Sequence, residues 1–133
     1  MRQPKQHMLF GSTNLSGLSD AIALNQKPLF HPVDGLSHLS LLTSGSIPSN
    51  PLELLSDGRF AKMLDDWRRS YEFVVLDTPP VSSYADGLAI ATLAGRVIVL
   101  SRGQHTSFRE TRALLRRLAT TQSRILGAVI NYF

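Results

Sequence analysis

The sequence predicts an α/β fold, with a mainly parallel sheet flanked by helices. Strand patterns and helical patterns alternate along the chain, and one strand pattern is apolar at four consecutive positions. Alternation is typical of parallel sheets, and a continuous apolar run is typical of a strand that is buried on both faces. Hydrophobic residues make up 43% of the 133 residues, which is enough for one core. We therefore expect a single domain over residues 1–133.

The predicted elements follow in chain order. A helical stripe at i, i+3, i+4 and i+7 identifies a crossover helix over residues 57–70, and it is formed by Phe60, Met63, Leu64 and Trp67. Strands are predicted before and after this helix, over residues 39–43 and 73–76. The other predicted elements are a short helix over residues 21–24, helices over residues 86–94 and 104–120, and strands over residues 96–100 and 125–130.

The helix predicted over residues 104–120 has two contrasting faces. The side chains expected to face inward are Phe108, Thr111, Leu114, Leu115 and Leu118. The outer face carries Arg109, Arg112, Arg116 and Arg117. A run of charges of this kind is usually a solvated face.

Composition and charge exclude several classes of protein. The chain has no cysteine, which excludes disulfides and thiolate metal sites. It has no apolar run of the ~18–20 residues that span a membrane, and residues 1–5 do not resemble a signal peptide. The net charge of +4 favours anionic partners such as phosphate, nucleic acid or an acidic membrane surface, without choosing among them. We expect a cytoplasmic protein.

Asp77 directly follows the apolar run of residues 73–76 and precedes Thr78-Pro79-Pro80. Because proline cannot continue a hydrogen-bonded ladder, the chain must leave the sheet at this point. Ligands of open α/β sheets bind at the carboxyl ends of the strands, and carboxylates there often hold Mg²⁺. The sequence thus predicts Asp77 as the metal-side aspartate of a nucleotide site. The alternative is that Asp77 only caps the following turn or helix.

The same edge of the sheet is expected to collect residues 43–45, Arg102 and Asn131, because each follows or ends a predicted strand. Residues 44–51 form a second candidate wall of the site, or else a plain connection between a strand and a helix. The motif GxxxxGK[ST], which wraps a polyphosphate in backbone N–H groups, does not occur in the sequence.

Several segments of the chain occur in a characteristic order. They are residues 1–7, Gly17-Leu18-Ser19, residues 41–45 with 48–55, residues 74–80 with Asp86, and residues 127–131. Together they resemble the bacterial tyrosine kinases (BY-kinases) of exopolysaccharide synthesis, most of all the chain-length-determinant-associated kinase of the EpsG type, and the resemblance covers nearly the whole chain. Asp77-Thr78-Pro79-Pro80 alone is shared with the wider deviant-Walker ATPases, including the partition and division-site-placing (ParA/MinD-type) ATPases. The segments that indicate the kinase branch are residues 2–7, Gly17-Leu18-Ser19 and residues 50–55.

The resemblance implies a P-loop NTPase-like fold of the deviant-Walker class and a role for individual residues. Asp77 matches the catalytic Walker B aspartate that orients the Mg²⁺ shell of ATP. Asn131 matches a position that contacts adenine, and Arg102 lies on a nearby loop where the base or ribose packs. Arg2 and Pro4 match the tail of a second Walker-type motif. Tyr132 is expected to be a packing residue rather than an autophosphorylation site.

The family's phosphate loop has no counterpart in this sequence, so the resemblance implies an N-terminally truncated, C-terminal part of one nucleotide-binding kinase-like domain. Met1 is then either a true start or an internal residue of a longer kinase. The implied function is that of an ATP-dependent tyrosine kinase regulating exopolysaccharide or capsule polymerisation and export, inactive as this chain alone. Whether the chain is an enzyme stays open at this point.

The implied partner is a polysaccharide co-polymerase, a chain-length-determinant membrane protein, which would bring the cytoplasmic chain to the membrane. No nucleic-acid partner is expected. One alternative is a non-catalytic kinase-like module that binds such a co-polymerase, and a weaker one is a fragment of a ParA/MinD-type ATPase.

Self-association is also expected. In the family, the phosphate-loop strand lies beside the strand that ends in Asp-Thr-Pro-Pro, so residues 73–76 would have an unpaired edge. Such an edge templates pairing with another chain. The alternative is that residues 97–100 pair directly with residues 74–76 and close the gap.

Overall fold

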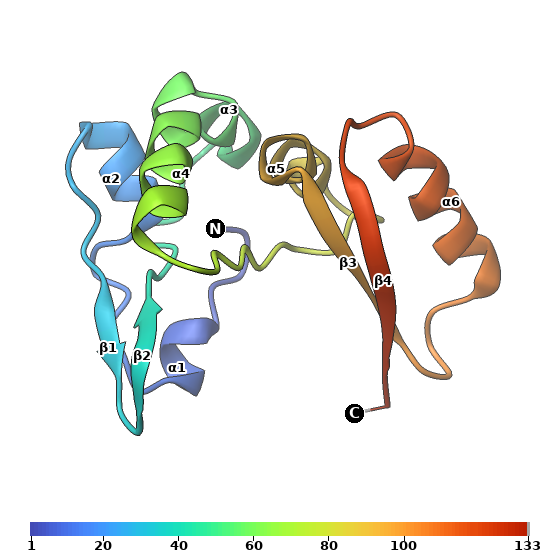
Figure 1. The fold of residues 1–133 in the computed structure, drawn as a ribbon, viewed down its shortest axis with the longest axis horizontal. Coiled ribbons are helices and arrows are strands. Elements are labelled where there is room, and N and C mark those ends of the chain that lie inside the picture. Colours follow the sequence, from blue (N-terminus) through green and yellow to red (C-terminus); the bar gives the residue numbers. More distant parts are fainter. Residues whose placement is uncertain (133) are drawn as a thin grey trace. The chain divides into compact units, whose positions relative to one another are not determined.

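The computed structural model describes residues 1–132, and the chain divides into two compact units, Met1–Phe73 and Val74–Phe133. Both units contain helices and strands (Figure 1). Among the described residues, no helix combines the length and the apolar character that crossing a membrane would need. The expectation of one domain over residues 1–133 stays a prediction.

The first unit holds two strands and four helices (Figure 1). In chain order these are α1 (Gln6–Leu9), α2 (Leu18–Leu24), β1 (His31–Val33), β2 (Leu36–Leu41), α3 (Pro51–Leu55) and α4 (Gly58–Ser70). The helix predicted over residues 21–24 is confirmed as part of α2. α3 was not predicted, because its five residues are too few to show a helical period.

The strand predicted over residues 39–43 overlaps β2, but it pairs differently from the prediction. β2 pairs with β1 in an antiparallel two-stranded sheet, so the prediction that it belongs to a parallel sheet is wrong. The reason is the turn between the strands, where Val33 lies opposite Leu36 and Gly35 has φ of +77°. An Asp-Gly pair is a strong hairpin signal, and it joins β2 to its immediate predecessor.

The predicted crossover helix is confirmed as α4. Its residues Phe60, Leu64 and Trp67 are buried, as the helical stripe predicted. The ring of Trp67 meets the ring of Phe60 edge-on, with the centroids 6.5 Å apart, and that of Phe30 at 5.8 Å. Trp67 is therefore a core residue of the first unit.

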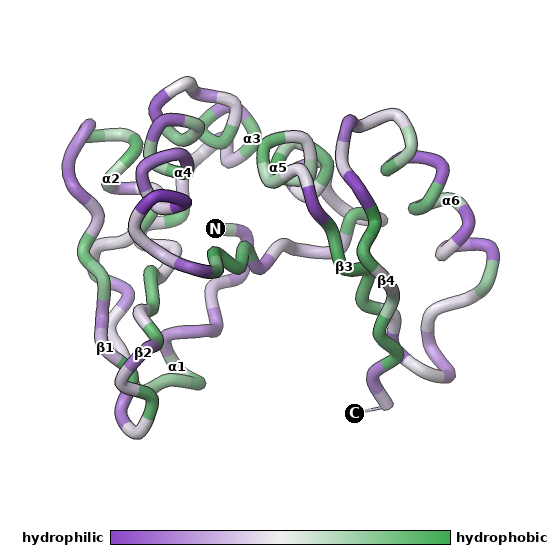
Figure 2. The backbone as a smooth tube through the Cα atoms, viewed as in Figure 1, coloured by the Kyte–Doolittle hydropathy of each residue, from purple (hydrophilic) through white to green (hydrophobic). Residues whose placement is uncertain are grey.

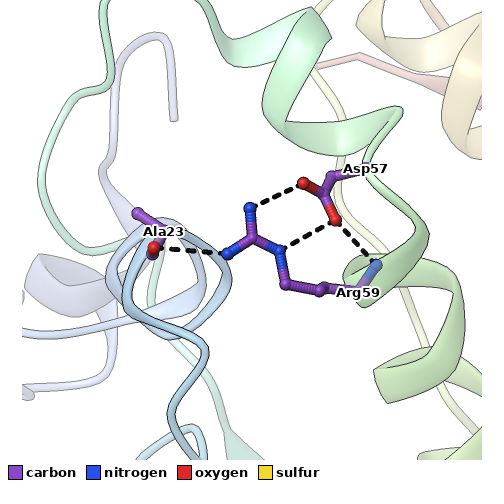
Figure 3. Close-up of polar contacts among 3 residues, drawn as sticks. All are labelled: Ala23, Asp57 and Arg59. Atoms are coloured by element: carbon purple, nitrogen blue, oxygen red, sulfur yellow. Dashed lines mark hydrogen bonds and ion pairs between the residues drawn. The ribbon is translucent and has the colours of Figure 1, made fainter.

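At the start of α4, Arg59 forms an ion pair with Asp57 and a hydrogen bond with α2 (Figure 3). Asp57 is the N-cap residue, and its Oδ1 accepts hydrogen bonds from the backbone N–H and Nε of Arg59. Arg59 Nη2 lies 2.6 Å from Asp57 Oδ2, and Nη1 donates to the carbonyl of Ala23. These hydrogen bonds and the Arg59 charge lower the pKa of Asp57 from 3.8 to about 2.

Hydrogen bonds join residues 17–20, at the start of α2, to residues 43–46, in the loop after β2. The N–H groups of Leu18 and Ser19 donate to the carbonyls of Thr43 and Ser44. The Asp20 carboxylate accepts from the N–H of Gly17 and of Ser46. Burial raises the pKa of Asp20, but the bonds from Ser46 and Gly17 outweigh it, so that the pKa is lowered overall.

The second unit contains the parallel strand pair (Figure 1). Its elements are α5 (Asp86–Ala94), β3 (Arg96–Arg102), α6 (Phe108–Leu118) and β4 (Arg124–Asn131). β3 and β4 run parallel, with α6 as the crossover between them. All four elements were predicted at these places, and the α/β fold class with a parallel sheet is confirmed.

The core of the second unit is small. Ala91 of α5, Val99 of β3 and Leu118 of α6 are buried together, and Leu88, Val97 and Leu114 pack against them. The middle of both strands is strongly hydrophobic (Figure 2). The inward positions predicted for Phe108 and Leu115 are wrong, because their side chains are 82% and 39% exposed. Phe108 occupies the first turn of α6, which extends beyond the core cluster.

Residues 73–76 do not form a strand in the described structure. Phe73 is 80% exposed and Val75 is 89% exposed. The prediction of a buried central strand is therefore wrong for this structure. β3 pairs only with β4 among the described strands, so the alternative in which residues 97–100 close the gap beside residues 74–76 is also not observed. A strand needs a neighbour to satisfy its backbone groups, and this segment has no ladder partner.

We expect Gly17→Ala to destabilise the first unit. A Cβ at Gly17 would overlap the backbone N of Gly45 and the carbonyl O of Thr43, neither of which can move independently of the chain. The loss should be about 2 kcal/mol or more, measured by urea unfolding with the fluorescence of Trp67, the single tryptophan.

Gly58→Ala is the matched control, because no atom lies within 4 Å of the added Cβ and the residue is helical. It should leave the stability unchanged or raise it by up to about 1 kcal/mol. If Gly17→Ala unfolded at the same urea concentration as wild type, the close packing of Gly17 against residues 43–45 would be contradicted.

The stability contributed by the Asp57 carboxylate should depend on pH. Because its folded pKa of about 2 lies below the unfolded 3.8, the contribution is fully present above pH 3.8 and is lost as the pH falls through about 2. Asp57→Asn keeps an N-cap side chain but removes the charge. Urea unfolding at several pH values between these limits should show a weaker pH dependence for the variant, and identical pH dependences would refute the ion pair.

Candidate functional site

The ends of the two parallel strands bring two of the predicted site residues together. In the register of β3 and β4, Arg102 lies opposite Asn131. Arg102 is exposed and Asn131 is half-buried. The prediction that these residues share one edge of the sheet is confirmed, whereas their role in nucleotide binding stays a prediction.

The loop after β3 folds back onto the end of β4. The N–H of Gly103 donates to the Asn131 carbonyl at 2.6 Å, and the N–H of Arg102 donates to Thr106 Oγ1 at 2.9 Å. A Cβ on Gly103 would lie 2.5 Å from the ring of Tyr132. The Tyr132 ring thus lies against this loop, although it is 74% exposed overall, and its role as a packing residue rather than an autophosphorylation site stays a prediction. The contacts hold the backbone beside Arg102 in place.

Asp77 is exposed, at the start of the loop that leads to α5. The N–H groups of Ser83 and Tyr84 both donate to the carbonyl of Pro80 at 3.1 Å, which closes a turn. The Val81 carbonyl accepts a 2.6 Å hydrogen bond from Arg117 Nη1 of α6. Asp77 therefore begins a loop whose far end is held by Arg117 of α6 and packs against the start of α5.

The backbone of Gly87 at the start of α5 supports this loop. A Cβ on Gly87 would lie 2.7 Å from Val81 Cγ2 and 3.4 Å from Thr78 Oγ1, so the loop packs directly on the helix backbone. Asp86 is only 1% exposed in the first turn of α5, where the helix dipole favours a negative charge. Sequence reasoning missed the supporting roles of Gly87 and Arg117. For Gly87, the sequence offered one indication, a small residue at the second position of a helix that follows a proline loop. For Arg117 it offered none.

The donor set of the second unit fits a magnesium ion that is bound mainly by its substrate. Among residues 1–132, no cluster of three or more His, Cys, Asp or Glu side chains exists. Mg²⁺ in nucleotide sites is usually held by one or two carboxylates, with phosphates and water as the other ligands. One exposed carboxylate at Asp77 is compatible with that arrangement and not with a dedicated protein cage.

Residues 43–45, predicted at the common edge of the sheet, and residues 44–51, predicted as a second wall or a plain connection, lie in the first unit. Their polar groups are used inside that unit, since Gly45 N donates to Asn14 Oδ1 and the Ser44 carbonyl accepts from Ser19 Oγ. Thr43 is almost fully buried and donates to the Ser16 carbonyl at 3.3 Å. The segment is therefore a structural connection, which is the second of the two interpretations that the sequence allowed.

The second unit is thus an α/β unit whose two parallel strands end at Arg102 and Asn131 and whose proline loop begins at the exposed Asp77. A scan against models of known protein families finds no match. Among curated proteins, the chain is 30% identical over 133 residues to the putative tyrosine-protein kinase CapB of Staphylococcus aureus. It is 34% identical over 134 residues to the tyrosine-protein kinase YwqD of Bacillus subtilis. Each alignment covers 98% of this chain but only 58% and 56% of these relatives, respectively.

Solved structures agree with this result. The chain is similar to the VpsO kinase domain, with a TM-score of 0.90 and 32% identity, over 99% of this chain and 66% of that one. It is also similar to the kinase domain of the Escherichia coli tyrosine kinase ETK, with a TM-score of 0.91 and 27% identity, over 98% of this chain and 51% of that one. The chain is therefore a homologue of the bacterial tyrosine-protein kinases, and the resemblance in its motifs is confirmed.

We expect Gly87→Ala to loosen the Asp77 loop. The added methyl group would push against Val81 and should cost about 1–3 kcal/mol. Hydrogen exchange followed by mass spectrometry should show faster exchange in residues 77–84. Gly127→Ala is the matched control, because nothing lies within 4 Å of its Cβ. Equal exchange in Gly87→Ala and wild type would contradict the packing of the loop on α5.

Proposed function

We propose that the chain is the C-terminal part of an ATP-dependent protein tyrosine kinase that regulates exopolysaccharide or capsule polymerisation and export. The observation that carries the proposal is homology to tyrosine-protein kinases over 98% of the chain. The chain spans little more than half the length of these two relatives. The activity is therefore proposed for the complete protein and not for this chain alone.

In this proposal ATP supplies the phosphoryl group and Mg²⁺ neutralises its charge. Asp77 would orient the metal shell from the start of the proline loop. Arg102 and Asn131, opposite each other at the ends of β3 and β4, would hold the base and ribose. Phosphoryl transfer depends almost entirely on positioning and charge stabilisation, so the supports of the Asp77 loop at Gly87 and Arg117 would also matter.

The proposed partner is a membrane-bound polysaccharide co-polymerase, and we propose a cytoplasmic location for the chain beside it. Support comes from a structural neighbour described as the chimerical protein CapA2B2, with a TM-score of 0.89 and 30% identity. Self-association through the unpaired residues 73–76 belongs to the same proposal, because unpaired apolar segments template pairing with another chain.

The alternatives receive less support. A fragment of a ParA/MinD-type ATPase would be expected to resemble partition ATPases, whereas the relatives found are named tyrosine-protein kinases. A non-catalytic module that binds a co-polymerase would keep the fold without needing Asp77. That alternative is separated from the kinase by the effect of an Asp77 substitution on turnover.

We expect the 133-residue chain to show no ATP hydrolysis or tyrosine phosphorylation above background, because its sequence has no GxxxxGK[ST] motif. When the chain is extended upstream by kinase sequence that carries this motif, turnover should appear. Asp77→Ala should then lower turnover by on the order of 100-fold or more, since metal-side charge stabilisation is worth several kcal/mol.

Asp34→Ala, which removes an exposed carboxylate from the hairpin turn, is the control and should keep turnover. Asp77→Ala should lower the urea midpoint far less than it lowers turnover, because Asp77 is exposed. Wild-type turnover in the extended Asp77→Ala protein would refute the assignment of Asp77. Mg²⁺-dependent turnover by the 133-residue chain would refute its inactivity.

A further inference from the structure

The positive charge of the chain is concentrated in the second unit. The first unit carries seven Lys and Arg residues and seven Asp and Glu residues, so its formal charge is zero. The second unit carries seven arginines, against only Asp77, Asp86 and Glu110. The formal net charge of +4 therefore belongs entirely to residues 74–133. Four of these seven arginines lie on α6.

Three of the α6 arginines form one exposed stripe. Arg109, Arg112 and Arg116 occupy positions i, i+3 and i+7, which lie above one another on one face of a helix. All three side chains are exposed, and their guanidinium groups have no ion pair or hydrogen-bond partner among residues 1–132. Arg117, by contrast, donates to the Val81 carbonyl. The stripe is therefore not used to hold the described fold together.

The single acidic residue of α6 does not neutralise this stripe. Glu110 accepts hydrogen bonds from the N–H and Oγ of Ser107 in the capping box at the start of the helix. These bonds lower the pKa of Glu110 and keep it charged there. Glu110 lies two positions before Arg112, which places the two residues on nearly opposite sides of the helix. The charge of the stripe is thus left unbalanced by its own element.

Apolar side chains border the arginines on the same face. Phe108 is 82% exposed and Leu115 is 39% exposed. They lie seven residues apart, with Arg112 between them at i+4 from Phe108 and i−3 from Leu115. The α6 outer face, defined as Phe108, Arg109, Arg112, Leu115 and Arg116, therefore combines a line of guanidinium groups with a line of apolar groups.

We propose that the α6 outer face binds the surface of an anionic phospholipid bilayer. The guanidinium groups would pair with lipid phosphates, to which arginine can donate two parallel hydrogen bonds. Phe108 and Leu115 would enter the boundary between headgroups and acyl chains, as amphipathic helices do when they lie flat in the interface. A bilayer offers phosphates to the arginines and an apolar region to Phe108 and Leu115. A nucleic acid provides phosphates and a stacking surface for Phe108 but nothing for Leu115.

This contact goes beyond the proposed kinase function. It needs neither ATP nor Asp77, and it places the chain directly on the membrane rather than only through a protein partner. It can therefore be tested on the 133-residue chain, whether or not that chain is part of a kinase.

Co-sedimentation with lipid vesicles tests the proposal. The chain should bind vesicles of phosphatidylcholine with about 30% phosphatidylglycerol and should not bind pure phosphatidylcholine vesicles. Binding should fall steeply when the salt is raised from about 0.1 M to about 0.5 M, because salt screens the contact. Replacing the three stripe arginines by glutamine should weaken binding by on the order of 100-fold, since each basic residue near such a surface is worth about fivefold.

Two triple variants serve as controls. The first removes the same charge from the first unit, at three exposed lysines, and should bind within about twofold of wild type; it is Lys5→Gln, Lys27→Gln and Lys62→Gln. The second keeps the charge of the stripe and should retain most of the binding; it is Arg109→Lys, Arg112→Lys and Arg116→Lys. Circular dichroism and Trp67 fluorescence check that each variant is folded.

A pair of single variants tests the apolar part of the face. Phe108→Ser should weaken binding to the anionic vesicles by on the order of tenfold, because a buried aromatic side chain is lost from the interface. Leu15→Ser, at an equally exposed apolar residue of the first unit, should leave binding unchanged.

Three results would overturn the proposal. They are equal binding to neutral and anionic vesicles, an equal loss of binding in the lysine-to-glutamine variant and the arginine-to-glutamine variant, and tighter binding to a single-stranded oligonucleotide than to the anionic vesicles. The last result would assign the α6 outer face to nucleic acid instead.

Discussion

Parallel hydrogen bonding between β3 and β4 is the constraint on which the rest of the second unit depends. Parallel neighbours need a long crossover, and α6 is that crossover. Its return over the sheet buries Leu118 with Val99 and Ala91 and leaves the arginines on the outside. The same pairing brings Arg102 opposite Asn131 and gives the loop after β3 an acceptor at the Asn131 carbonyl. Core, candidate site and charged face thus follow from one pair of strands.

Local patterns were sufficient to predict the elements whose partners are close in sequence. α4 was found from its helical periodicity, α5 from its place after the proline loop, and β3 and β4 from short apolar runs with a helix between them. The same reasoning failed for residues 73–76, whose apolar run suggested a central strand. A strand exists only where a neighbour accepts its hydrogen bonds, and no described strand pairs with this segment. It also failed for β2, where the Asp34-Gly35 turn determined the pairing.

The candidate site was predictable to the extent that it consists of strand ends. Arg102 and Asn131 could be brought together because parallel strands end at one edge. Asp77 could be singled out because prolines follow it. The contacts of Gly87 and Arg117 with Val81 could not be predicted. Arg117 binds a carbonyl 36 residues away, and a periodic sequence pattern does not indicate contacts between such distant residues. The exposure of Phe108 could not be predicted either, because a helical stripe does not show how far the core extends along it.

The central claim is that Asp77, Arg102 and Asn131 belong to one nucleotide site. Photo-crosslinking tests it most directly, using the chain extended upstream with kinase sequence and an ATP analogue that carries an azido group on adenine. The account predicts that the label, identified by mass spectrometry, attaches within residues 102–106 or 131–133 and that excess ATP with Mg²⁺ suppresses it. Attachment confined to residues 1–73, or labelling unaffected by ATP, would contradict the account.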